Sequence, residues 1–79
     1  MSPTVLREGP YRFFFFSREE ARPHVHVVCG DGEAKFWLAP LVSLAEHTGV
    51  DAKQLRQIQT IVEEHRDEII RSWHEHFGG

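Results

Sequence analysis

Turn residues divide the first forty residues of the chain into short apolar segments, a pattern typical of β-strands. The Gly9-Pro10 pair marks a turn between a first strand over residues 4–7 and a second over residues 11–17. The second strand is dominated by aromatic residues, which β-sheets favour. Pro23 has no amide hydrogen for a sheet ladder, so it suits the position just before the next strand.

Residues 24–29 and 33–38 flank Gly30-Asp31-Gly32 and predict a β-hairpin, because Asp-Gly is a strong signal for a two-residue turn. A turn centred on Asp31-Gly32 sorts the paired side chains onto two faces. The apolar face pairs Cys29 with Ala34, Val27 with Phe36 and Val25 with Leu38. The other face pairs Val28 with Lys35 and His26 with Trp37, with His24 nearby.

In the C-terminal part, apolar residues recur at every third or fourth position, as in a helix, and no longer at every second position. Residues 41–45 are apolar and fit either a short helical turn or an edge strand. Asp51 is a plausible N-cap, with Gln54 three residues later as in a capping box. An apolar stripe then runs to the end of the chain, through Leu55, Ile58, Val62, Ile69, Trp73 and Phe77.

These patterns predict an α+β fold, in which a small antiparallel sheet of three to four strands, built from N-terminal hairpins, packs on one long C-terminal helix. We expect one domain over residues 1–79, with the sheet at about 3–39, a connector at 40–50 and the helix at about 51–77. A chain of 79 residues has a thin core and is a candidate for support from a partner.

Composition limits the classes of function. A single cysteine, Cys29, excludes an internal disulfide and a metal site built from a cysteine cluster. The formal charge of −3 gives no general attraction to nucleic acid, although arginines in the N-terminal part leave room for a local anion-binding patch. The start of the chain does not resemble a signal peptide, and the longest apolar run, residues 13–16, is too short to cross a bilayer. We therefore expect a cytoplasmic protein that does not bind membranes.

His24 and His26 are the most informative residues for chemistry. They stand two apart on a strand, so both imidazoles project from one face, roughly 7 Å apart. Two histidines can act as general base and general acid, Lys35 can neutralise a phosphate, and Trp37 can stack on a base. One hypothesis is therefore a metal-independent ribonuclease with His24, His26 and Lys35 as catalytic residues, and whether the protein is an enzyme stays open. RNA would then be a partner.

A metal-binding interpretation uses the same pair of imidazoles. It needs a third or fourth ligand. The candidates are Glu33, Asp31, Glu19 and Glu20, and they reach the imidazoles only if loops fold back. We therefore assign no metal ligand and no cofactor.

A third interpretation is a docking surface. Of the four consecutive phenylalanines, Phe13 and Phe15 point opposite to Phe14 and Phe16. One helix covers only one face of the sheet, so two of the four are left on the histidine face. A homodimer or a small cognate protein is the simplest cover, unless residues 41–48 fold over that face. The predicted binding residues are Trp37, Arg22, Glu33 and His65. His65 is included although its place on the apolar stripe puts it on the side away from His24 and His26.

The chain resembles the small bacterial proteins grouped as domain of unknown function 4160. The matching motifs are residues 3–5, 11–17, 23–27, 30–38 and 63–66, with Ile69 and residues 73–77. This resemblance implies one component of a two-gene pair, with a second small protein beside it, of the kind suspected to be toxin–antitoxin modules. It implies no catalytic residues. The leading hypothesis is a toxin–antitoxin-like component that uses the histidine face either to cleave RNA or to dock its partner.

Overall fold

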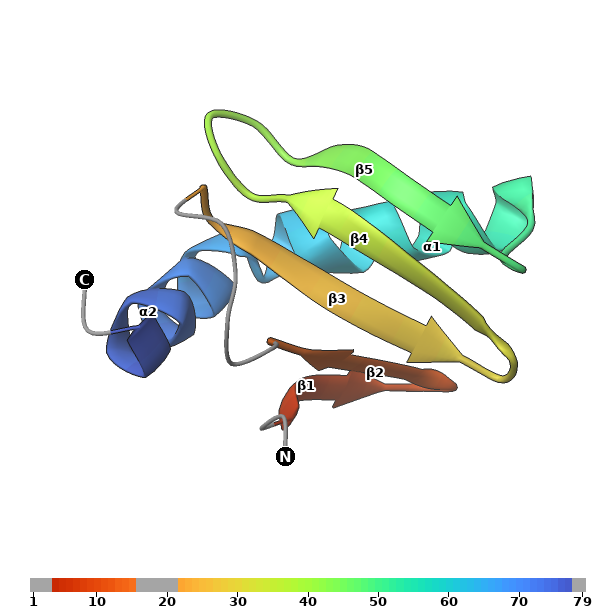
Figure 1. The fold of residues 1–79 in the computed structure, drawn as a ribbon, viewed down its shortest axis with the longest axis horizontal. Coiled ribbons are helices and arrows are strands. Elements are labelled where there is room, and N and C mark those ends of the chain that lie inside the picture. Colours follow the sequence, from red (N-terminus) through yellow and green to blue (C-terminus); the bar gives the residue numbers. More distant parts are fainter. Residues whose placement is uncertain (1–3, 16–21, 78–79) are drawn as a thin grey trace.

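A five-stranded antiparallel sheet forms one layer of the protein and two helices form the other (Figure 1). The computed structural model describes residues 4–15 and 22–77. The strands are ordered β1-β2-β3-β4-β5, so each pairs with its neighbour in sequence. The elements are β1 (Thr4–Glu8), β2 (Tyr11–Phe14), β3 (His24–Cys29), β4 (Gly32–Trp37), β5 (Ser43–Thr48), α1 (Ala52–Glu64) and α2 (Arg66–Phe77).

The core lies between the helices and one face of the sheet. Alternate residues of each strand point into it, because successive side chains of a strand project to opposite faces. The predicted apolar face is confirmed. The strands contribute Phe13, Val25, Val27 and Phe36, and Leu38 follows directly after β4; each is at most 1% exposed. The helices contribute Ile58, Val62, Ile69 and Trp73.

The predicted register of the β3–β4 hairpin is wrong by two residues. Val25 pairs with Phe36 and His26 with Lys35, so the turn is centred on Gly30-Asp31 and not on Asp31-Gly32. Gly30 has φ +58° and takes the first central position of the turn, and Asp31 takes the second with negative φ. A two-residue hairpin turn with this combination of angles needs glycine at its first central position. A shift of two keeps each side chain on its predicted face, and for that reason the two faces were predicted correctly.

Gly32 belongs to β4 because its backbone meets another segment of the chain. A Cβ atom at Gly32 would lie 2.4 Å from the carbonyl oxygen of Gly49 and 2.8 Å from Val50 Cγ2. Gly49 itself has φ +70° and turns the chain from β5 toward α1. The close approach of these two glycines fixes where the hairpin ends relative to the start of the helical layer.

The sheet has five strands, so the prediction of three to four is wrong. The fifth is β5, which lies inside the predicted connector and pairs with β4 as an edge strand. The register shifts between Lys35 and Phe36, so this pairing contains an irregularity that the sequence pattern did not reveal. Because β5 extends the sheet sideways, residues 43–48 do not fold over the histidine face.

Two helices replace the single long helix that was predicted. α1 begins at the predicted cap, where Asp51 Oδ1 accepts a hydrogen bond of 2.8 Å from the Gln54 amide, and it ends at His65, whose φ of −109° and ψ of 15° leave the helical region. The next residue, Arg66, donates from Nε to the Leu38 carbonyl oxygen at 2.8 Å. No proline or glycine lies within residues 52–77, so contacts with the sheet, not local sequence, accompany the break. In the described part of the chain, no helix is long and apolar enough to cross a bilayer.

Replacing Gly32 with alanine tests the close approach to Gly49. We expect Gly32→Ala to lower the free energy of unfolding by about 1–3 kcal/mol, because backbone atoms have to move to admit the methyl group. Asp31→Ala is the matched control next to it in the turn. Asp31 is exposed and has negative φ, so alanine fits its backbone and a change within about 0.5 kcal/mol is expected. Urea denaturation measures both, and equal losses would contradict the proposed packing.

Candidate functional site: the outer face of the sheet

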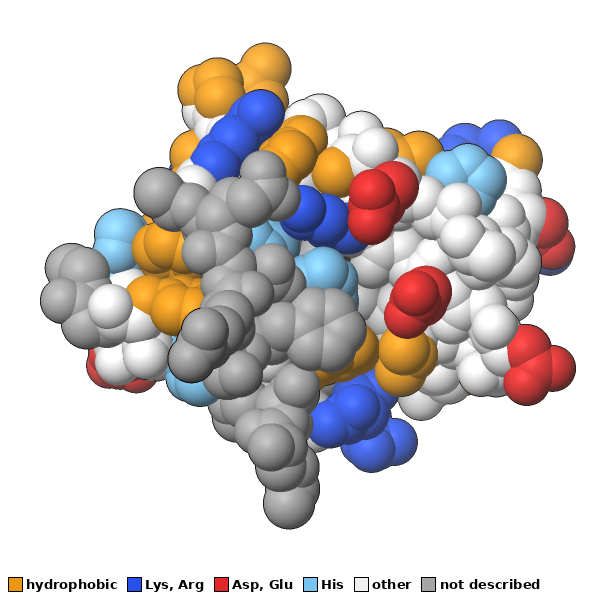
Figure 2. All heavy atoms as spheres, in the orientation of Figure 1, with side chains coloured by type: hydrophobic (Ala, Val, Ile, Leu, Met, Phe, Trp, Pro, Cys, Tyr) orange, Lys and Arg blue, Asp and Glu red, His pale blue; other side chains and the backbone are white. Residues whose placement is uncertain are grey.

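The face of the sheet that the helices leave uncovered carries the predicted histidines. Cross-strand pairs place Phe14 beside His26, His26 beside Lys35, and His24 beside Trp37. Figure 2 views this side and shows basic, histidine and acidic side chains interspersed over the strands. We call this surface the outer face; it comprises Arg12, Phe14, Arg22, His24, His26, Lys35 and Trp37.

His24 is buried although it points away from the helical layer. Its side chain is 1% exposed, and Nδ1 donates a hydrogen bond of 2.7 Å to the carbonyl oxygen of Arg22. The ring also meets two aromatic neighbours edge-on, with centroid distances of 5.2 Å to His26 and 5.6 Å to Trp37. His24 is therefore packed as part of the wall behind His26 and Trp37, and a substrate on the surface does not reach its imidazole in this conformation.

Trp37 lies between two cations. The Arg22 guanidinium carbon is 4.3 Å from the indole ring and Lys35 Nζ is 4.5 Å from it, both within the range of cation–π attraction. Arg22 is itself held, because its Nε donates to the Ala39 carbonyl oxygen at 2.9 Å. The indole, the guanidinium and the ammonium are thus ordered together before any ligand binds.

Phe14 extends this aromatic row across β2. Its ring stacks on His26 with a centroid distance of 5.7 Å, and the Arg12 guanidinium lies 5.0 Å above it. Arg12 Nε also donates to Thr4 Oγ1 at 2.8 Å, which ties the row to β1. Two of the four phenylalanines were predicted to lie on this face and to need a cover. Phe14 is one of them and is only 5% exposed within the chain itself, whereas Phe16 lies outside the described residues.

A pocket of about 260 Å³ opens beside His26 and Lys35. Glu33, predicted as a binding residue, lies in its wall, so the structure brings these three predicted residues together. The remaining wall comes mainly from β5, through Glu46, His47 and Thr48. These three residues were not predicted, because the segment before Gly49 had no assigned structure.

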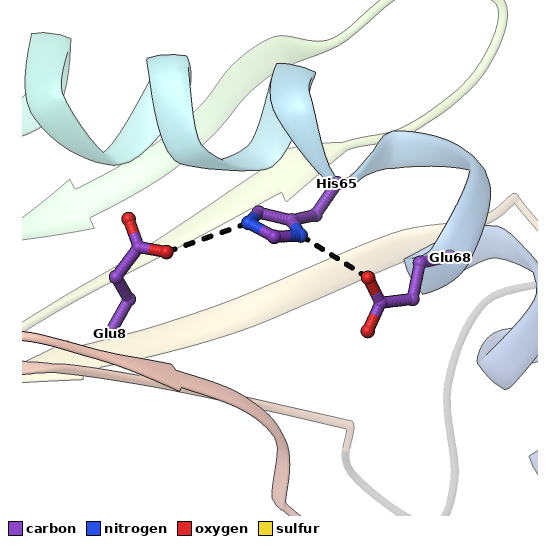
Figure 3. A network of polar contacts seen from close by, with 3 residues as sticks. All are labelled: Glu8, His65 and Glu68. Atoms are coloured by element: carbon purple, nitrogen blue, oxygen red, sulfur yellow. Dashed lines mark hydrogen bonds and ion pairs between the residues drawn. The ribbon is translucent and has the colours of Figure 1, made fainter.

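His65 does not join the outer face. It lies at the junction of α1 and α2, where Nδ1 is 3.2 Å from Glu68 Oε1 and Nε2 is 3.5 Å from Glu8 Oε1 (Figure 3). This agrees with its expected place away from His24 and His26. The hydrogen bond with Glu68 is the main cause that raises the pKa of His65, and the charges of Glu68 and Glu8 act in the same direction, while burial opposes them.

A second cluster of polar side chains, which the sequence analysis did not identify, surrounds His65. Glu8 comes from the end of β1 and Glu64 from the end of α1, and the ligating atoms of these two residues and His65 all lie within 4.8 Å of one another. Glu64 and His65 are adjacent in sequence, so this half of the cluster could have been found from the sequence. Glu8 could not, because only the packing of the β1–β2 hairpin under the helix junction brings it to His65.

The raised pKa of His65 predicts a pH-dependent contribution to stability. The folded state binds the imidazole proton more tightly than the unfolded state, whose pKa is near 6.5. The contribution is therefore fully present below pH 6.5 and is lost as the pH rises through the higher folded-state value. An NMR titration of the His65 ring in EDTA should give a pKa above 6.5, and Glu68→Gln should bring it closer to that value. A pKa of 6.5 or lower in the unmodified protein would contradict this.

The comparisons with known proteins bear on the same residues. The search of curated proteins and the search of solved structures each found no match. A family model matches residues 11–74, a span that includes β2 to β5, α1 and most of α2. All seven predicted site residues fall within it, from Arg22 to His65. The chain belongs to the family described as "Domain of unknown function (DUF4160)".

Proposed function

We propose that the protein is a non-catalytic binding module whose outer face docks a small cognate protein. In this proposal it is one component of a toxin–antitoxin-like two-gene pair, as the resemblance of the sequence implies. The interaction needs a surface that is ordered in advance and that combines aromatic and basic groups. The outer face offers both kinds of group within a few ångströms of each other.

Trp37 and its two flanking cations are the observation that carries this proposal. Tryptophan and arginine are enriched among the residues that dominate binding energy at protein interfaces. Trp37 is half-buried, so part of the indole remains accessible while Arg22 and Lys35 restrict its motion. A partner that meets this group loses little conformational freedom of these side chains, which favours affinity. The basic groups favour a partner segment that bears carboxylates.

The burial of His24 counts against the ribonuclease hypothesis. General acid–base catalysis on RNA requires each catalytic group to reach the reacting oxygens directly or through one water molecule. His26 is half-buried and Lys35 is beside it, but His24 is 1% exposed and its Nδ1 is engaged with the Arg22 carbonyl. The pair that was predicted as acid and base thus reduces to one accessible imidazole.

Among the described residues, the two imidazoles of His24 and His26 have no further metal ligand, and the candidate ligands Glu19 and Glu20 lie outside those residues. Within residues 4–15 and 22–77, no aspartate, glutamate, cysteine or additional histidine joins these two imidazoles to form a set of three. Trp37 and Lys35, their cross-strand partners, are not suitable ligands. Docking of a protein therefore remains the function that the outer face supports best.

A binding measurement with the small protein encoded by the neighbouring gene tests this proposal. We expect Trp37→Ala to weaken association by about 2 kcal/mol or more, because it removes the central aromatic group. Arg22→Gln should weaken it less, since it removes one flanking cation. Arg56→Gln is the matched control, because Arg56 is an exposed arginine on α1, on the helical side. Calorimetric titration of each folded variant measures the effect, and equal affinities for all three would refute docking at this face.

Two alternative functions of the outer face are RNA cleavage and self-association. The variant His26→Ala tests RNA cleavage. His26 is preferable to His24 as a test because it is half-buried, whereas a change at His24 also disturbs packing. We expect the purified protein not to cleave RNA, and His26→Ala to leave growth on expression unchanged. Cleavage that His26→Ala abolishes would establish the enzyme instead. A dimer that Trp37→Ala dissociates would replace the cognate protein by a second copy of this chain.

A further inference from the structure

Carboxylates from three elements converge on His65 at the junction of the two helices, on the opposite side of the sheet from the outer face. Glu8 ends β1, Glu64 ends α1, and Glu68 lies in the first turn of α2. Figure 3 shows Glu8 and Glu68 pointing at the two nitrogens of the imidazole from opposite sides. We propose that Glu8, Glu64 and His65 bind a divalent transition-metal ion, with Zn²⁺ as the representative.

The spacing of the ligand atoms suits a single ion. One imidazole nitrogen and two carboxylate oxygens lie within 4.8 Å of one another. Ligands of Zn²⁺ lie at about 2.0–2.2 Å from the ion, which places pairs of ligand atoms about 3–4 Å apart. Since Glu8 and Glu64 are exposed and their side chains are long, small rotations about their side-chain bonds bring the oxygens to that spacing. A mixed nitrogen and oxygen set favours Zn²⁺ and similar ions over Ca²⁺, which prefers oxygen alone.

Glu68 orients the imidazole for this role. With the ring proton on Nδ1, His65 donates to Glu68 Oε1 at 3.2 Å, and the lone pair of Nε2 is directed toward Glu8. Metal-binding histidines in proteins are typically held in this way, by a carboxylate on the nitrogen that does not touch the ion. Glu68 is thus a positioning residue, and the ion lies between Nε2, Glu8 and Glu64.

Glu64 and an adjoining pocket supply a second, separate line of support. In the part of the chain that the structure describes, the Glu64 carboxylate has no hydrogen bond or ion pair, so Glu64 gives up no contact when it binds an ion. The ion replaces only the contact of 3.5 Å between His65 and Glu8. A pocket of about 400 Å³ opens beside it, and both Glu8 and Glu64 lie in its wall with Tyr11, Gln57 and Thr60. Three protein ligands leave a fourth position of a tetrahedral ion, and this pocket has room for a water molecule or a small ligand there.

Calorimetric titration of the EDTA-treated full chain with Zn²⁺ tests the site. We expect one ion per chain, and Glu64→Gln should weaken binding at least tenfold. Glu68→Gln should weaken it by about 10–100-fold through the orientation of the ring. Glu63→Gln is the matched control, since Glu63 is the preceding carboxylate on α1 and accepts a hydrogen bond from Gln59 that glutamine can also accept. It should leave the affinity within twofold.

NMR of the histidine rings identifies the ligand directly. Zn²⁺ should shift the Nε2 resonance of His65 more than that of any other histidine, and a variant with His74→Gln and His76→Gln should bind as tightly as the unmodified chain. The proposal is overturned by an absence of saturable binding. It is equally overturned if Glu64→Gln and Glu63→Gln behave alike, or if binding is lost with His74 and His76. None of these results depends on the function proposed for the outer face.

Discussion

The arrangement of functional groups depends on a single limit: one layer of two helices covers only one face of the sheet. Side chains alternate along each strand, so every residue of β3 and β4 belongs either to the core or to the outer face. Val25, Val27 and Phe36 occupy the covered side, and each is at most 1% exposed. His26, Lys35 and Trp37 are then obliged to lie on the side that the helices leave open.

The outer face offsets the absence of a helical cover with contacts among its own side chains. Phe14 stacks on His26, His24 meets both His26 and Trp37 edge-on, and arginine side chains lie over the rings at either end. Such contacts contribute modest free energies individually, about 0.5–1.5 kcal/mol for an aromatic pair. Together they restrict the side chains, so the outer face has a defined shape even without a helical cover. One result is the burial of His24. The two histidines look equivalent in sequence, but His24 is packed inside the row of rings, whereas His26 is half-buried and remains accessible.

The sequence was sufficient to predict which residues share a face, because a strand has a period of two and an error of two residues leaves the faces intact. The register itself depends on Gly49, which lies seventeen positions after Gly32 and gave no local signal. β5 was left undecided for a related reason, since residues 43–48 lack a clean alternation and an irregularity interrupts their pairing with β4. These features are set by contacts between distant segments.

The candidate sites differ in how far the sequence could predict them. His24, His26, Lys35 and Trp37 are close in sequence on two adjacent strands, so a local pattern sufficed to bring them together. The cluster at His65 combines residues 8, 64, 65 and 68, and it exists only because a helix breaks where a hairpin turn meets it. The apolar stripe continues through that break without a proline or glycine, so periodicity alone predicted one continuous helix.

The contact between Gly32 and Gly49 links two parts of the chain that otherwise appear independent. Gly32 ends a hairpin turn, and Gly49 lies just before the cap of α1, with their backbones too close for a side chain at position 32. Any relative that carries a larger residue at position 32 has to reroute the chain around position 49, and with it the first turn of α1. Substitutions at these two positions should therefore be correlated across descendants of a common ancestor. An insertion in the loop before α1 would move the two backbones apart and so remove the restriction on side-chain size at both positions.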